Sequence, residues 1–88
     1  MIVLNSTSAA GLAAGLSDEL AEMGYVVAEP TNYTPELTDT MIFHADGFSL
    51  EALALADTAV DGVVASDPAL AAAHGVDVVV VLGLSYQE

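Results

Sequence analysis

The first 24 residues constrain the fold most, because they join an apolar segment, a polar turn and an amphipathic segment. The apolar run at positions 2–4 predicts a buried strand over residues 1–5. The turn Asn5-Ser6-Thr7-Ser8 carries side chains that cap helices, and we expect Ser8 to be the N-cap residue. A strand that passes through such a turn into a helix predicts the first half of a β–α unit.

The next segment extends this unit to a second strand. Leucines recur every four residues between positions 12 and 20 and predict a helix over residues 9–23 with one buried face. Gly24 follows this helix and can take the left-handed conformation that ends many helices. Residues 25–29 are mostly apolar and predict a strand. The strand–helix–strand order favours a right-handed parallel crossover.

The rest of the chain alternates in the same way. Asp67-Pro68 indicates a helix start, with aspartate as N-cap and proline in the first turn. The near-continuous apolar run at residues 76–82, in which only Asp77 is polar, fits a central strand covered on both faces, or one whose outer face is partly shielded. We expect Leu50, Leu53 and Ala54 to lie on the buried face of a helix over residues 49–58. The other expected elements are an exposed loop at 30–39, a strand at 40–44, a turn at 61–62, a strand at 63–65, a helix at 69–73 and a tail at 83–88.

Length and element order together predict the fold class. Eighty-eight residues make a single domain, over residues 1–88, whose core is adequate but small. We expect an α/β fold, a compact two-layer sandwich in which a mixed β-sheet carries two main helices on one face. The absence of cysteine excludes disulfides, thiolate metal sites and a cysteine nucleophile.

The charge balance excludes several functions. The chain has 13 Asp and Glu residues and no Lys or Arg, which gives a formal net charge of −13. Nucleic-acid binding requires cations that neutralise phosphates, so we expect no nucleic-acid partner. P-loop and Schiff-base chemistry lack their lysine. No apolar run is long enough to span a membrane and no signal peptide is present in the sequence, so we expect no direct membrane insertion by this segment.

Four stretches resemble one known family in order and spacing. They are the strand–turn–helix start at 3–13, the segment at 24–27, the strand at 39–44 and the final strand with its glycine at 79–83. Across residues 2–84 the chain is similar to the LytR C-terminal domain, the small domain that follows LytR-CpsA-Psr enzymes and occurs in related envelope proteins. Two glycines of the family's turn are Ser6 and Ser8 here, and the arginines typical of its first helix are absent.

The resemblance implies an extracytoplasmic accessory domain of a bacterial cell-envelope protein, without catalytic machinery or a cofactor of its own. We expect it to bind a cell-wall glycan, a peptide or an envelope protein, and we expect the parent protein to be membrane-anchored upstream. The alternative is a structural or oligomerisation module with no small ligand, in which a sheet edge pairs with a second copy and the domain self-associates. An enzyme fragment is the third reading, and no nucleophile–base or metal constellation supports it.

The candidate ligand-binding residues are Asn5, Ser6, Thr7 and Ser8 in the first turn, together with Tyr33. The turn offers hydrogen bonds at a helix N-terminus, where N–H groups point outward, and the alternative, which the residues favour, is that these side chains serve only as helix caps. We expect binding through this turn and through the proline-containing loop at 30–39, in which Tyr33 could contact sugar rings. We interpret the acidic residues as a solvated face, and we predict no catalytic residue and no metal site. The two histidines, His44 near Asp46 and His74 before Gly75, are interpreted as a strand-end residue and a helix-capping residue.

Overall fold

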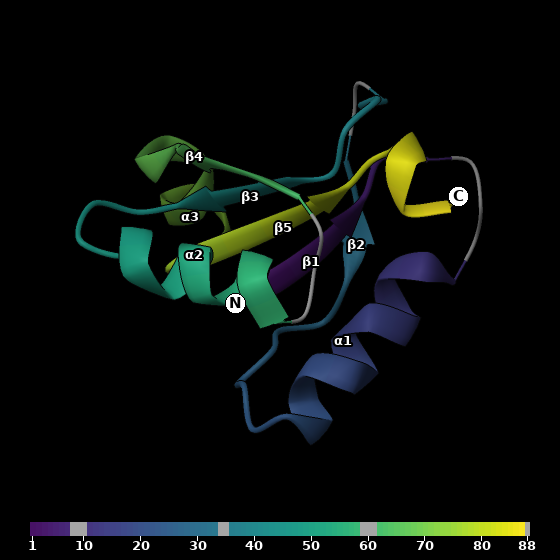
Figure 1. Cartoon of the computed structure of the whole chain (residues 1–88), viewed down its shortest axis with the longest axis horizontal. Helices are drawn as coiled ribbons and strands as arrows, with labels where there is room; N and C mark the ends of the chain where they lie inside the picture. The colour runs from purple at the N-terminus through teal and green to yellow at the C-terminus, as the bar shows by residue number, and fades with distance from the viewer. Residues whose placement is uncertain (8–10, 34–35, 59–61, 88) are drawn as a thin grey trace.

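The computed structural model describes residues 1–7, 11–33, 36–58 and 62–87, which form a mixed five-stranded sheet with helices on both faces (Figure 1). The strand order is β2-β1-β5-β3-β4. This agrees with the predicted α/β class and its mixed sheet. The strands are β1 (Ile2–Asn5), β2 (Thr31–Asn32), β3 (Met41–His44), β4 (Val63–Ser66) and β5 (Val78–Leu82), and the helices are α1 (Leu12–Glu22), α2 (Ser49–Thr58), α3 (Pro68–His74) and the 3-10 helix η1 (Leu84–Gln87).

Two parallel β–α–β units make up the sheet. In the first, β1 leads through α1 to β2, which pairs parallel with β1. In the second, β3 leads through α2 to β4, which pairs parallel with β3. The final strand β5 inserts between them, parallel to β1 and antiparallel to β3. The parallel crossover predicted for the first unit is therefore confirmed, and β2 and β4 are the two edges of the sheet.

The strand β5 is the middle strand of the sheet and lies at the centre of the core. All five of its residues are buried, as expected for a strand with neighbours on both sides and helices above and below. Val78, Val80 and Leu82 pack on one face of the sheet, and Val79 and Val81 pack on the other. The run at 76–82 was predicted to form such a strand because it lacks the polar alternation of a half-exposed strand.

The helices divide between the two faces of the sheet. Leu16 and Leu20 of α1 and Leu55 of α2 belong to one core cluster, so the two main helices share a face as predicted (Figure 1). The short helix α3 covers part of the opposite face through Ala71. No helix within the described ranges is both long enough and apolar enough to cross a membrane.

Residues 25–29 do not form the predicted strand, and Pro30 supplies the physical reason. Ala28 donates its N–H to the Met1 carbonyl at 2.7 Å, so the segment begins to pair alongside the start of β1. Along a parallel strand every second N–H donates to the same neighbour, and the next donor would be Pro30, which has none. The pairing resumes one residue later in β2, where Tyr33 donates to Asn5. The predicted strand is thus displaced to Thr31–Asn32.

The buried face of α2 also differs from the prediction. The structure buries Ala52 and Leu55, and it leaves Leu50 75% and Leu53 50% exposed. Ala54 is exposed as well. The helix has apolar residues around its whole circumference, so periodicity could not select the face that meets the sheet.

The predicted tail at 83–88 is partly folded against the sheet. Leu84 donates its N–H to the Leu37 carbonyl at 2.9 Å, and Tyr86 packs against the core. Gly83 allows this close approach, because a Cβ at that position would lie 2.5 Å from the Asp39 carbonyl oxygen. The loop at 30–39, predicted to be exposed, is therefore held to the body of the domain at the half-buried Leu37.

The predicted signals at the start of α3 and at the ends of α1 and α3 are confirmed. Asp67 caps α3, since its Oδ1 accepts from the Leu70 N–H at 3.0 Å. Gly75 ends α3 and Gly24 follows α1, both in left-handed conformation. The start of α1 was predicted wrongly. Gly11 has a φ of 87°, which no α-helical residue adopts, so Gly11 and not Ser8 is the N-cap residue, and the helix begins at Leu12 instead of residue 9. Ser8 itself lies outside the described residues, as does Asp61 of the predicted turn at 61–62.

Candidate functional site

A hollow of about 310 Å³ lies where β1 and β2 end and α1 begins. In open α/β sheets, ligands bind beyond the carboxyl ends of parallel strands, beside a helix N-terminus. We call it the amide hollow, because asparagines end both strands. Its lining consists of Asn5, Gly11, Ala13, Ala14, Pro30, Thr31 and Asn32.

The asparagine pair is the chemical core of this hollow. Asn5 and Asn32 are register partners in the parallel pairing of β1 with β2. Residues directly paired in adjacent strands project from the same face, so both carboxamides lie on the side of the sheet that α1 covers. Asn5 is only 6% exposed, whereas Asn32 is exposed at the sheet edge. Each carboxamide carries a carbonyl acceptor and an N–H donor group, which suits amide and hydroxyl partners.

The first turn fixes the orientation of Asn5. Its Oδ1 accepts from the Thr7 backbone N–H at 2.9 Å and from the Thr7 hydroxyl at 2.7 Å. This arrangement is an Asx turn, in which a side chain replaces a backbone acceptor. The predicted residues Asn5 and Thr7 are therefore in direct contact, and the carboxamide of Asn5 is held in one orientation beside the hollow.

Ser6 joins three segments of the chain. Its hydroxyl donates to the Leu82 carbonyl at 2.6 Å and accepts from the Leu37 N–H at 3.1 Å. Its own N–H also donates to the Leu82 carbonyl, at 3.1 Å. The side chain is 6% exposed, so these bonds fix the end of β5 and the 36–39 loop to the first turn. Ser6 is not among the described residues that line the hollow. It shapes the site indirectly, because its hydrogen bonds hold the backbone of Leu82 and Leu37 against the first turn.

Tyr33 lies on the opposite side of the sheet from the amide hollow. Its side chain packs against the cluster that contains Ile2 and Leu4, which is the face covered by α3. Only its backbone reaches the first turn, where its N–H donates to the Asn5 carbonyl at 2.9 Å. The structure thus brings Asn5 and Thr7 together and places the Tyr33 ring elsewhere, and Ser8 lies outside the described residues.

The sequence interpretation placed binding at the loop 30–39 but singled out Tyr33 there instead of Thr31 or Asn32, and it did not name Gly11, Ala13 and Ala14 of the other lining residues. A signal for Asn32 was present, because a parallel crossover brings the carboxyl ends of its two strands to one edge. Using it required the correct end of the second strand. The expected strand at 25–29 ended before Pro30 and concealed the asparagine pair.

The amide hollow is uncharged. None of the described residues that line it is ionisable, and the chain contains no Lys or Arg that could reach it. Among the described residues, no group of three or more His, Cys, Asp or Glu side chains is arranged to hold a metal ion. His44 is buried on β3, and its Nδ1–H donates to the Ala45 carbonyl at 3.0 Å. Burial lowers the pKa of the Met1 amino group and raises that of Tyr86, and neither residue is among the described residues that line the amide hollow.

Comparison with known proteins gives one family and one similar fold. The model of the LytR_C family, described as LytR cell envelope-related transcriptional attenuator, matches residues 2–86. The solution structure of the C-terminal domain of RV0431 is similar with a TM-score of 0.63 and 26% identity, over 93% of this chain and 69% of that one. No curated protein matches the chain.

Proposed function

The chain belongs to the LytR_C family of cell-envelope proteins, and from this membership we propose that it is a non-catalytic, extracytoplasmic binding domain. Its ligand is an uncharged polar segment, either the glycan or the peptide of the cell wall, and it binds in the amide hollow. Asn5 of the first turn lines this site, Thr7 holds the Asn5 carboxamide, and Asn32 supplies a second carboxamide.

The register pairing of Asn5 with Asn32 carries this proposal. The exposed carboxamide of Asn32 presents a donor and an acceptor, as an N-acetyl group or a peptide bond requires, and the Asn5 carboxamide, held by Thr7, borders the same hollow. The volume of about 310 Å³ is at the lower end of the range for small-molecule pockets, so it suits one sugar ring or one or two peptide units rather than a large cofactor.

Charge narrows the class of ligand further. The net charge of −13 repels anionic wall polymers and anionic membrane surfaces. The family description includes transcriptional attenuation, but a chain without Lys or Arg cannot neutralise a phosphate backbone. We therefore propose no nucleic-acid partner and favour the uncharged, amide-rich part of peptidoglycan.

Co-sedimentation with insoluble peptidoglycan tests the proposal. The wild-type domain should pellet with the polymer, and Asn32→Ala should lose most of this binding because it removes an exposed carboxamide without touching the core. Ser66→Ala is the matched control, since it truncates an exposed polar side chain on β4, the other edge of the sheet. Equal pelleting of Asn32→Ala and Ser66→Ala, or none for the wild type, would contradict the proposal.

Self-pairing through a sheet edge is the second candidate, because β4 is an edge strand whose Val63 is exposed. An unpaired edge offers backbone hydrogen bonds to a second copy. The net charge opposes this association at low salt. Light scattering at several salt concentrations distinguishes wall binding from self-pairing, since edge pairing predicts that the dimer fraction increases with added salt.

A further inference from the structure

A second hollow of about 240 Å³ lies at the opposite end of β1 from the amide hollow. Met1, just before β1, and Val78, the first residue of β5, line it together with Glu51 of α2. We call it the N-terminal hollow. Apolar side chains dominate its lining, including Tyr25 and Phe48, and two carboxylates, Glu51 and Asp77, complete it.

Large aliphatic side chains are exposed at this end of the molecule. Val26, which lines the N-terminal hollow, is 89% exposed, and Leu50, next to the lining residue Glu51 in α2, is 75% exposed. Within the described residues these are the two most exposed large hydrophobic side chains. A hollow with exposed apolar residues beside it is typical of a surface that contacts another molecule.

The charge beside the hollow indicates what that molecule carries. Glu51 and Asp77 are both exposed, and the chain offers them no Lys or Arg. The Met1 α-amino group already occupies this region and donates to the Val26 carbonyl at 3.3 Å. Burial lowers the pKa of that amino group, and the Asp77 carboxylate acts in the opposite direction. For this half-buried amino group the effect of burial outweighs that of Asp77. The exposed carboxylates of Glu51 and Asp77 are the groups that a solvent-facing cation of another molecule would meet here.

We propose that the N-terminal hollow docks a segment of a partner protein in which one large apolar side chain is flanked by Lys or Arg residues. The apolar side chain enters the hollow, and the basic residues face Glu51 and Asp77. Charge complementarity decides against a second copy of this chain as the occupant, because that copy would also carry −13 and could offer no Lys or Arg. This inference is independent of the amide hollow and its ligand.

Short synthetic peptides, acetylated and amidated at their ends, test the proposal on the 15N-labelled domain. The first has a central leucine with lysines on both sides, the second replaces the leucine by alanine, and the third replaces the lysines by glutamine. We expect the first peptide to shift the backbone amide signals of Tyr25, Val26, Phe48 and Glu51, and to bind more tightly than the other two. Added NaCl should weaken its binding, because exposed charges are screened.

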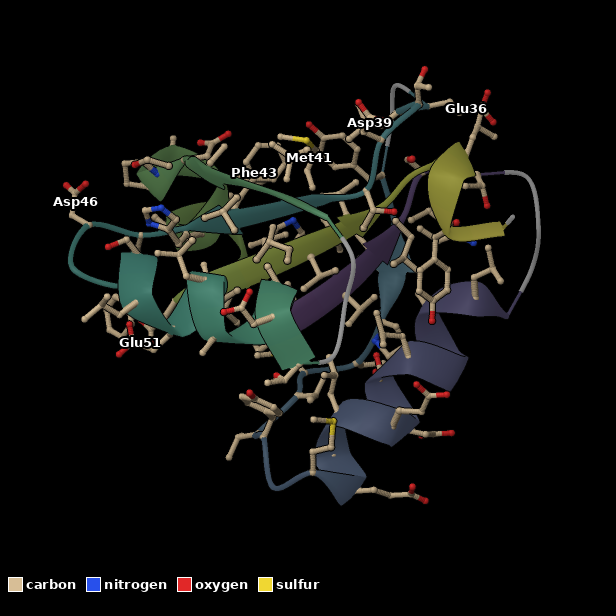
Figure 2. The ribbon with its side chains drawn as sticks, in the orientation of Figure 1. Glu36, Asp39, Met41, Phe43, Asp46 and Glu51 are labelled. Atoms are coloured by element: carbon tan, nitrogen blue, oxygen red, sulfur yellow. The ribbon has the colours of Figure 1, made fainter. Side chains whose placement is uncertain are left out.

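Paired variants locate the site. Glu51→Gln combined with Asp77→Asn should weaken binding of the first peptide by about 3- to 10-fold, the range expected for two exposed ion pairs. Glu36→Gln combined with Asp39→Asn makes the same change in charge far from Glu51 in the molecule (Figure 2) and should leave binding unchanged. Thermal melting of both variants verifies that they are folded. The comparison of the three peptides on the wild-type domain tests the proposal even if a variant fails to fold.

Several results would overturn the inference. Equal binding of the leucine and alanine peptides would show that the apolar hollow does not take up the leucine. An equal loss of peptide binding in both paired variants would show general attraction of a basic peptide to an acidic protein. Shifts at Asn5 and Asn32 instead would assign the peptide to the amide hollow. Concentration-dependent shifts at Val26 and Phe48 without peptide would make a second copy the occupant.

Discussion

Two buried serines should respond in opposite directions to the same substitution. Ser6 and Ser17 are 6% and 7% exposed, so each hydroxyl is removed from water. The Ser6 hydroxyl bridges the Leu82 carbonyl and the Leu37 N–H, whereas the Ser17 hydroxyl has no partner among the described residues. A buried hydrogen bond contributes about 0.5–1.5 kcal/mol, and a donor left without a partner costs about 1–3 kcal/mol.

These magnitudes give the expected shifts. Ser6→Ala removes two hydrogen bonds and leaves the Leu37 N–H unsatisfied, while the Leu82 carbonyl keeps its bond from the Ser6 N–H. We expect a loss of about 2 kcal/mol, or about 8–16 °C in melting temperature for a domain of this size. Ser17→Ala removes an unpaired hydroxyl inside α1 and improves helix propensity, so we expect a gain of about 0.5–1 kcal/mol.

Urea unfolding followed by circular dichroism measures both free energies of unfolding. Amide hydrogen exchange provides a local readout, because Ser6→Ala should reduce the protection of the Leu37 amide selectively. Shifts of the same sign in the two variants, or unchanged protection at Leu37, would refute the view that hydrogen-bond satisfaction decides the effect of a buried hydroxyl here.

Three further predictions follow from charge, capping and titration. Because a net charge of −13 opposes compactness, molar NaCl should raise the melting temperature, and a melt unaffected by salt would contradict this. Asp67→Ala should cost about 1 kcal/mol in urea unfolding by removing the cap on the Leu70 N–H, whereas Asp67→Asn should cost much less. Burial, with a smaller contribution from Glu19, raises the pKa of Tyr86 above 10.0. The folded state therefore holds this proton more tightly, and the stability it contributes is present below pH 10.0 and lost as the pH rises through the folded pKa. Tyr86→Phe should make the alkaline decline in melting temperature less steep.

The elements that the sequence predicted well are those encoded by near neighbours. Asp67, Pro68 and Gly75 begin and end α3 through contacts within a few residues, and the structure reproduces each role. The bounds of α2 were predicted as observed, Ser49–Thr58. The continuous apolar run before Gly83 indicated a central strand, because only a strand covered on both faces can bury every side chain.

The sequence pattern could not predict which face of a helix packs on the sheet or where the second strand pairs. The helix α2 is apolar all round, so only contact with β3 and β4 selected Ala52 and Leu55 for burial and left Leu50 and Leu53 exposed. Because Pro30 has no N–H, β2 forms at Thr31–Asn32, after the proline, instead of at the expected residues 25–29. That shift created the Asn5–Asn32 pair, and it left the Tyr33 ring on the other face.

The sequence by itself determined the β–α–β organisation, the family, the central strand and the absence of any side-chain cation other than histidine. The tertiary structure alone decided what the first turn does. Asn5 turns toward a hollow completed by β2, and Ser6 bonds to Leu82 and Leu37, 76 and 31 residues away in the chain. Local propensity and periodicity depend on residues a few positions apart, whereas such partners are chosen only when distant strands come together in one register.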